Sequence, residues 1–363
     1  MAAHVAAATI SDMSTDPIDT SALGKPVEIA QISRELKNLW DSSAGGMTRA
    51  SLINFAVCFR GAAAIAENTN FIVEFTRHHA CRALLLCLEP DSAENKISAW
   101  INAHCHLTRA GAKQVCCEQI SFLFEGHTEQ RLTNALFAHL DSDLPLYLWW
   151  QGEFPEQIDE TLWAWVDRLI YDSQTWRDPK QQLRLLRDSM DRAQSRLTLC
   201  DLNWARTLHL RQATAQMFDY PENLAVLNGL ERVEIKHAPE YRSTALLLVA
   251  WFAAQLELTN PERVPTGFAF HRKKEQVQFD LVAEPGRSIS LCELTAPSGR
   301  VRLQRDLQGE FFRVEVQLTD GKTFQHLLPA GSNATTSLLL WEISGGSRHQ
   351  IYRRTLDVIE ELL

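Results

Sequence analysis

The pattern of apolar residues changes near Pro261, and this change constrains the fold more than any other feature of the sequence. Before it, apolar residues form continuous runs such as Ala83–Leu88 and Pro145–Trp150, which are typical of strands covered on both faces. After it, short runs alternate apolar and polar residues and are separated by turn signals such as Asp320-Gly321. The sequence therefore predicts two sheets of different kinds.

The chain length supports this division, because 363 residues exceed the roughly 250–300 at which one hydrophobic core stops growing. We predict a combined α/β and α+β fold. Residues 1–25 are expected to form a disordered tail, 26–200 an N-terminal mixed-sheet α/β domain, 201–260 a central pair of helices, and 261–363 an antiparallel β-meander domain with a closing helix.

Periodicity and turn signals place the elements of the first domain. Expected strands are Leu52–Arg60, Ala83–Leu88, Ile97–Leu107, Val115–Phe124 and Pro145–Trp150, and expected helices are Asn68–Ala80, Thr128–Leu140, Gln157–Tyr171 and Lys180–Leu197.

The second half is expected to begin with two helices, Asp201–Phe218 and Pro239–Leu258, of which the second is nearly apolar all round and should be buried. A final helix, His349–Leu362, should pack on a face of the meander. The meander strands are expected at Phe268–Arg272, Val277–Val282, Ile289–Leu294, Val301–Asp306, Phe311–Leu318 and Thr323–Leu328.

Charge and hydropathy exclude several classes of partner. A formal net charge of -9 argues against a nucleic-acid or anionic-membrane surface, because both need a basic face. The longest nearly apolar run, Ala245–Ala254, is about half of the roughly 20 residues that a membrane-spanning helix needs. No Lys or Arg precedes Lys25, which is unlike a signal or transit peptide. We expect a cytoplasmic protein.

The standard catalytic fingerprints for dinucleotides, P-loops, zinc proteases and serine hydrolases do not occur in the sequence. The segment Asp320–Thr323 imitates the end of a phosphate loop, but Val316 stands where that loop needs glycine, and a hairpin turn is the better interpretation. We predict no catalytic residue, no metal site and no cofactor.

Eight cysteines are too few for a disulfide scaffold, and no C-x-x-C motif occurs, so we expect a reducing compartment. Cys105, Cys116 and Cys117 lie on two strands of a predicted hairpin. With a four-residue loop at Arg109–Ala112, Cys105 lies opposite Cys116 at a distance that a disulfide accepts, and a slip of one residue moves the partner to Cys117. These three are redox candidates, and the alternative is that they are buried apolar fillers.

The neighbouring histidines, His104 and His106, add ligand types that zinc binds. In a strand, however, His104 and Cys105 point to opposite faces, so only part of the set can converge.

One segment carries a family resemblance. Asp201-Leu-Asn-Trp-Ala-Arg206, followed by Arg211-Gln212 and Phe218-Asp219, resembles the signature of the glucose-6-phosphate dehydrogenase assembly protein family, OpcA. Supporting similarities are Asp143–Trp150 and Cys116–Ile120, so the resemblance covers about residues 30–360. Leu210 departs from the family, in which many members carry Trp at that position.

The resemblance implies a non-enzymatic activator that binds glucose-6-phosphate dehydrogenase of the oxidative pentose phosphate pathway and favours its active oligomer. It also implies thioredoxin control in photosynthetic members, which would give the cysteines a role. The candidate partner-binding residues are those of the signature: Asp201, Asn203, Trp204, Arg206 and Arg211.

Two interpretations of this signature stay open. Arg206 and Arg211 are the residues expected to reach the partner. Alternatively, Asp201 simply caps a helix and Trp204 is buried. Two functional alternatives also remain, a sugar-phosphate-binding protein or enzyme with a non-standard site, and a stand-alone redox or metal sensor.

Overall fold

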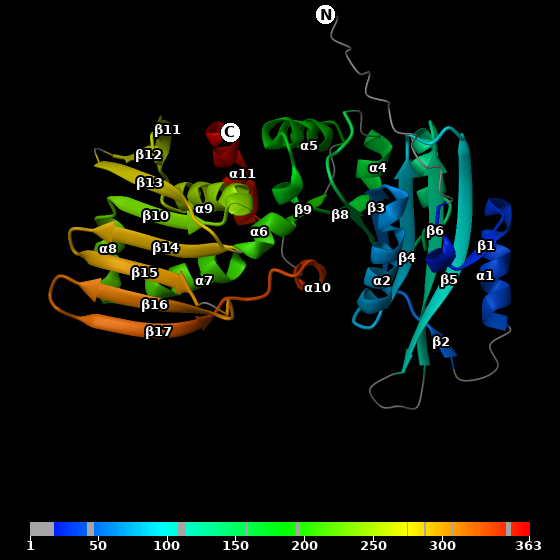
Figure 1. Ribbon diagram of the computed structural model, residues 1–363, viewed down its shortest axis with the longest axis horizontal. Helices are drawn as coiled ribbons and strands as arrows, with labels where there is room; N and C mark the ends of the chain where they lie inside the picture. The colour runs from blue at the N-terminus through cyan, green and yellow to red at the C-terminus, as the bar shows by residue number, and fades with distance from the viewer. Residues whose placement is uncertain are drawn as a thin grey trace, which may run out of the picture.

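The computed structural model describes residues 18–41, 47–107, 114–156, 159–193, 197–273, 275–286, 288–306, 308–345 and 350–363. Of the predicted disordered tail, residues 1–17 lie outside this part, and 18–25 include a short 3-10 helix, Ser21–Leu23. Two sheets lie toward opposite ends of the long axis, with α5 (Pro179–Ala193), α6 (Leu202–Arg206) and α10 (Thr335–Ser344) between them (Figure 1). The predicted fold class is confirmed.

The first sheet has a parallel centre and an antiparallel edge. Its order is β1 (Lys25–Val27), β5 (Lys96–Leu107), β6 (Gln114–Glu125), β4 (Cys81–Glu89), β3 (Ile53–Arg60), β7 (Leu146–Trp150), β8 (Val166–Tyr171) and β9 (Thr198–Asp201), with β2 (Met47–Arg49) beside β6. Neighbours from β6 to β9 are parallel, whereas β5 and β1 run antiparallel to their neighbours. The strand order reverses between β3 and β7, and such a switch point is where open α/β sheets usually bind ligands.

Both faces of this sheet are covered, as its continuous apolar runs predict. Buried side chains of α2 (Ile65–Phe75) and α10 pack on one face, and those of α1 (Ile32–Asp41), α3 (Leu132–Phe137) and α4 (Glu160–Trp165) pack on the other. For this reason Trp149 and Trp150 are both buried although neighbours in a strand point to opposite faces.

The second sheet has the order β11 (Thr259–Val264), β12 (Gly267–Arg272), β13 (Glu275–Ala283), β10 (Arg232–His237), β14 (Ile289–Ala296), β15 (Gly299–Arg305), β16 (Phe311–Leu318) and β17 (Thr323–Pro329). The six predicted meander strands correspond to β12–β17. However, β10 comes from the predicted helical segment 201–260 and inserts parallel to β13 and antiparallel to β14. Its alternating sequence, in which Val233 and Ile235 are buried, explains this placement.

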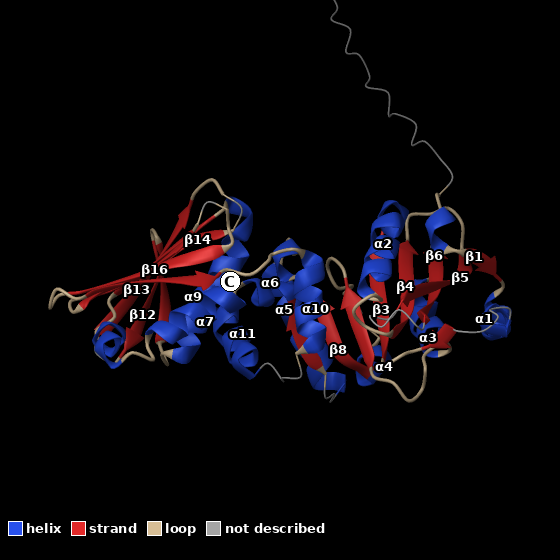
Figure 2. Cartoon of the chain, turned by 90° about the horizontal axis from the view of Figure 1, so that it is seen from below, coloured by secondary structure: helices blue, strands red, loops and turns tan. Residues whose placement is uncertain are grey.

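Helices cover one face of the second sheet. The helices α7 (Leu208–Met217), α8 (Leu224–Asn228) and α9 (Arg242–Gln255) contact its strands, and Figure 2 shows α7, α9 and α11 (Gln350–Leu362) on the same side. The apolar helix α9 is buried from Thr244 to Ala253, as its composition predicts. The closing helix was expected on the sheet itself, but α11 packs mainly against α9. The expected first residue of that helix, His349, lies outside the described residues.

Two predicted helices are wrong in part. Of the expected helix Gln157–Tyr171, residues 157 and 158 lie outside the described residues and Glu160–Trp165 is helical. The rest is wrong, because Val166–Tyr171 pairs with strands on both sides as β8. The expected helix Asp201–Phe218 is divided into α6 and α7 at Thr207, whose hydroxyl donates to the Trp204 carbonyl. The helix α10 was not predicted.

The two halves share one hydrophobic core. A continuous cluster of buried side chains extends from the first sheet, through Trp204 and Leu248, to Leu294 and Val314 of the second sheet. No helix among the described residues is long and apolar enough to span a membrane.

Candidate functional site

The signature residues gather where β8 and β9 end, between the two halves of the molecule. Asp201 is the last residue of β9 and the N-cap of α6. Its Oδ1 accepts hydrogen bonds from the backbone N–H groups of Asn203 (2.9 Å) and Ser173 (3.0 Å). Its Oδ2 accepts from Ser173 Oγ (2.7 Å) and from the Tyr352 hydroxyl of α11 (2.9 Å). One buried carboxylate thus joins the first sheet to the last helix.

Asn203 extends this network to α9. Its Nδ2 donates to Ser173 Oγ (3.0 Å) and to Ser243 Oγ (3.3 Å), and its Oδ1 accepts from Thr244 Oγ1 (2.5 Å). Asn203 is fully buried, so these partners satisfy an amide that would otherwise be costly to bury.

An ion pair closes one side of the cluster. Arg206 of α6 donates from Nη1 and Nη2 to the two carboxylate oxygens of Asp172, at 2.7 and 2.6 Å. The side chains of Arg206 and Asp172 are 8% and 17% exposed. The pair therefore fixes α6 against the end of β8.

Arg211 and Trp204 form the other side. The Arg211 guanidinium carbon lies 3.4 Å from the centre of the Trp204 ring, and its Nε donates to Thr207 Oγ1 at 2.8 Å. Burial lowers the pKa of Arg211 to about 9. The Trp204 ring also lies 5.2 Å from the ring of Tyr352. Arg211 is thus held by a ring face and by a hydroxyl group.

The carboxyl group of Asp201 is less acidic than that of an ordinary aspartate. Burial and the nearby charge of Asp172 raise its pKa to about 6, although hydrogen bonds from Ser173 and Tyr352 act in the opposite direction. The network therefore takes up a proton at mildly acidic pH.

The structure brings all five predicted signature residues together. The expected capping role of Asp201 and the expected burial of Trp204 are confirmed. Contact of Arg206 and Arg211 with another protein stays a prediction, and in the isolated chain their guanidinium groups are occupied by Asp172, Trp204 and Thr207.

Sequence reasoning missed the partners of the signature. Asp172 and Ser173 directly follow β8, and an acidic and a hydroxyl residue after a buried strand are the available signal. The sequence hides this signal because the pattern of the preceding residues predicts a helix.

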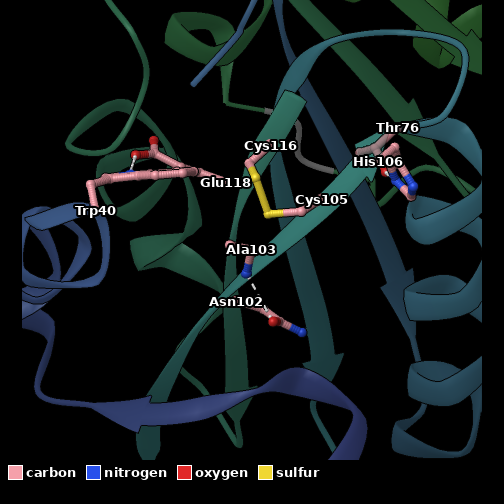
Figure 3. The surroundings of a disulfide bond; sticks show 8 residues. All are labelled: Trp40, Thr76, Asn102, Ala103, Cys105, His106, Cys116 and Glu118. Carbon is pink, nitrogen blue, oxygen red and sulfur yellow. Dashed lines mark hydrogen bonds between the residues drawn. A yellow bond between two sulfur atoms is a disulfide. The ribbon is translucent and has the colours of Figure 1, made fainter. Parts of the chain in front are cut away.

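A second candidate site is the disulfide between Cys105 and Cys116 (Figure 3). The hairpin of β5 and β6 has the predicted register, in which Cys105 lies opposite Cys116, with 4.0 Å between their Cα atoms. The predicted loop Arg109–Ala112 lies outside the described residues. Helices flank the hairpin, since Trp40 of α1 donates to Glu118 at 2.6 Å and Thr76, just after α2, lies 3.0 Å from His106.

The third redox candidate, Cys117, lies outside this disulfide and is buried. A hydrogen bond from the thiol of Cys81 lowers the pKa of Cys117 to about 7. Within the part of the chain that the structure describes, no three His, Cys, Asp or Glu side chains are placed to hold a metal ion.

The residues at the switch point of the first sheet form two hydrogen-bonded contacts. Glu89, at the end of β4, accepts a hydrogen bond from the backbone N–H of Ala62 at 2.7 Å, at the turn that leads from β3 into α2. Asn68 of α2 and Gln151, just after β7, are joined by amide hydrogen bonds of 2.5 and 3.4 Å. In dinucleotide-binding sheets, the N–H groups of this turn bind the pyrophosphate. In this chain a carboxylate occupies one of them.

Comparison with known families finds two matches that follow one another along the chain. A family model described as the glucose-6-phosphate dehydrogenase subunit N-terminal domain matches residues 73–188, and one described as the C-terminal domain of the same subunit matches residues 197–356. A search of curated proteins finds no match.

Several solved structures have a distantly similar fold. An aldose-aldose oxidoreductase from Caulobacter crescentus is 10% identical, with 85% of this chain and 96% of that chain covered and a TM-score of 0.45. A dehydrogenase (MviM) from Clostridium difficile is 8% identical, with 85% and 98% covered and a TM-score of 0.41. An oxidoreductase from Bacillus cereus is 9% identical, with 86% and 95% covered and a TM-score of 0.44. With TM-scores below 0.5, these similarities carry no conclusion about activity.

Proposed function

Because this chain belongs to the OpcA family of glucose-6-phosphate dehydrogenase assembly proteins, we propose that it binds that dehydrogenase and acts as its non-enzymatic assembly factor and allosteric activator. The observation that carries this proposal is the pair of family matches, which together span residues 73–356 and so include both halves and the cluster between them.

The hydrogen bond between Ala62 and Glu89 supports a role without catalysis. A dinucleotide bound at the switch point of the first sheet would bring its pyrophosphate to the turn before α2, where the Glu89 carboxylate already accepts the hydrogen bond of the Ala62 N–H. Two negative groups at one helix start repel each other, and only one can accept that hydrogen bond. The oxidation of glucose 6-phosphate would then be catalysed by the dehydrogenase and not by this chain.

Activation by such a partner follows from differential binding. A protein can shift the dehydrogenase toward its active oligomer only by binding that state more tightly than the other. Coupling free energies of about 1–3 kcal/mol correspond to changes of about 5–150-fold, which is the range expected for this activator.

The signature cluster would serve this role by fixing the two halves against each other. Asp201 and Asn203 bond to residues of α11 and α9, and Arg206 bonds to the end of β8. A partner that contacts both halves would then meet a preformed surface, which lowers the entropic cost of binding.

The disulfide supports redox control of the activator. Disulfides in cytosolic proteins are usually redox-sensing, and Cys105–Cys116 lies near the end of the hairpin at which β5 leads into the loop to β6. Thioredoxin would reduce it by exchange: two electrons and two protons pass from the thioredoxin dithiol, leaving two thiols in this chain and a disulfide in thioredoxin.

The test is to mix the purified chain with its cognate dehydrogenase and to measure both co-elution and the reaction rate at low glucose 6-phosphate. We expect a complex, a higher rate, and no dehydrogenase activity of the chain alone. Failure to co-elute and to change the rate, under oxidising and under reducing conditions, would overturn the proposal. Activity of the chain alone would favour an enzyme with a non-standard site.

A further inference from the structure

A cavity of about 320 Å³ lies beside the signature cluster, between the two halves of the molecule. One wall comes from the first half, with Trp176 and Leu183, and the opposite wall comes from α9 and α11, with Leu246 and Leu356. Its volume is at the lower end of the range of about 300–1,000 Å³ for ligand sites, which often lie between domains.

Two arginines in the lining of this cavity lack partners. Arg177 and Arg242 are exposed, and neither guanidinium forms an ion pair or a hydrogen bond with any residue that the structure describes. The lining also holds carboxylates: the exposed side chain of Glu240 and the terminal carboxylate at Leu363, which accepts a hydrogen bond from Arg263 at 3.5 Å. A further carboxylate, that of Asp201, already accepts hydrogen bonds from Ser173 and Tyr352. The guanidinium groups of Arg177 and Arg242 therefore remain available to bind an anion.

A neighbouring cavity provides a contrast within the same protein. It has about 330 Å³ and lies on the other side of Leu183 and Leu356, which line both cavities. Its arginines are engaged: Arg187 pairs with Asp357 and Glu360, each at 3.1 Å, and Arg353 donates to a backbone carbonyl at 3.0 Å. Both arginines of this second cavity thus have partners, whereas Arg177 and Arg242 have none among the described residues.

The lining of the cavity also includes a hydroxyl donor, Ser243. Ser243 Oγ accepts a hydrogen bond from Asn203 at 3.3 Å and donates none to another described residue. Two guanidinium groups, one hydroxyl and an aromatic wall are complementary to an oxyanion attached to an apolar body.

We propose that this cavity binds a small organic anion, a carboxylate or a phosphate monoester, whose charged group lies at Arg177 and Arg242 and whose apolar body lies against Trp176 and Leu246. Because both halves line the cavity, the ligand stabilises their observed arrangement. The site is therefore an effector site between the two halves of the molecule.

The experiment uses the full chain alone, with phenyl phosphate and phenylacetate as the two probes. Calorimetry measures affinity, and quenching of Trp176 fluorescence reports occupancy of the cavity. We expect saturable binding of at least one probe, and the effective probe identifies the preferred oxyanion. Binding should weaken with added salt, since the two guanidinium groups are exposed.

The double variant Arg177→Gln/Arg242→Gln should bind about tenfold more weakly, which is the effect of losing two exposed charge contacts. Arg313→Gln is the matched control, because Arg313 is exposed on β16, in the other sheet, and should leave affinity unchanged. The variant Trp176→Phe should lose the change in fluorescence on titration, which assigns that signal to the cavity.

Absence of saturable binding of both probes, or equal affinity of the double variant and the wild type, overturns the proposal. The dehydrogenase takes no part in this experiment, so its outcome is independent of the proposed function.

Discussion

The guanidinium group of Arg206 donates two hydrogen bonds to the carboxylate of Asp172, at 2.7 and 2.6 Å, and both side chains are largely buried. The pair connects the helix after β9 to the end of β8. A buried pair is weak evidence for stability in itself, but removal of one partner leaves an uncompensated charge in a poorly solvated place.

Arg206→Gln should therefore lower the free energy of unfolding by about 3 kcal/mol, because Asp172 loses its partner while remaining buried. Denaturant titration measures this loss, and adding Asp172→Asn should restore part of it. Arg313→Gln, on the exposed face of β16, should change stability by less than about 0.5 kcal/mol.

The same variant separates the two roles of Arg206. If Arg206→Gln keeps the stability of the wild type but no longer co-elutes with the dehydrogenase, Arg206 contacts the partner directly and its pair with Asp172 does not stabilise the fold.

The Asp201 carboxyl predicts a dependence of stability on pH. Its pKa in the folded protein is about 6, above the value near 3.9 of an unfolded chain, so the folded state binds more protons between these two pH values. Stability from this group is therefore fully present below pH 4 and is lost as the pH rises to about 6. The slope approaches about 1.4 kcal/mol per pH unit.

Asp201→Asn provides the comparison, because the amide oxygen can still accept from the two backbone N–H groups. The stability of the wild type minus that of the variant should fall between pH 4 and pH 6 and be constant above pH 7. A difference that is flat over this range, or that rises, contradicts the raised pKa.

The parts of the fold that are local in sequence could be predicted from sequence. The register of Cys105 and Cys116 depends only on a short loop, and the continuous run Ala83–Leu88 indicates a strand covered on both faces. Burial of α9 follows from its composition.

The parts that depend on distant contacts could not be predicted in this way. Arg168 lies in the middle of β8. A charged residue is atypical of a buried strand, so the sequence does not predict a strand there. The Arg168 guanidinium donates to the carbonyls of Glu342 and Gly345, which are more than 170 residues away. Tyr352 is likewise 151 residues from Asp201, so the completed cluster is visible only in three dimensions.

The hydrogen bond that Glu89 accepts from Ala62 leads to predictions about stability and about dinucleotide binding. Glu89→Ala should lower the free energy of unfolding by about 1 kcal/mol, because the Ala62 N–H at the helix start loses its acceptor. The wild type should not bind NADP+ in a calorimetric titration. Saturable NADP+ binding by the wild type contradicts the idea that Glu89 excludes a pyrophosphate from this turn. Glu94→Ala, at an exposed carboxylate without an ion pair to a described residue, is the control for stability.

The Cys105–Cys116 disulfide predicts a redox response in both stability and activation. It closes a loop with a sequence separation of 11, so its loss should cost about 3 kcal/mol through the entropy of the unfolded chain. Cys105→Ser should therefore unfold like the reduced wild type under all conditions, and its effect on the dehydrogenase should no longer respond to reductant. Cys292→Ala removes a buried free cysteine of the second sheet and should keep the response.

Counting free thiols in the oxidised protein checks that the disulfide is present: six free thiols are expected, and eight would exclude the disulfide. A response to reductant that persists in Cys105→Ser places the switch in the dehydrogenase, since no other pair of described cysteines is joined.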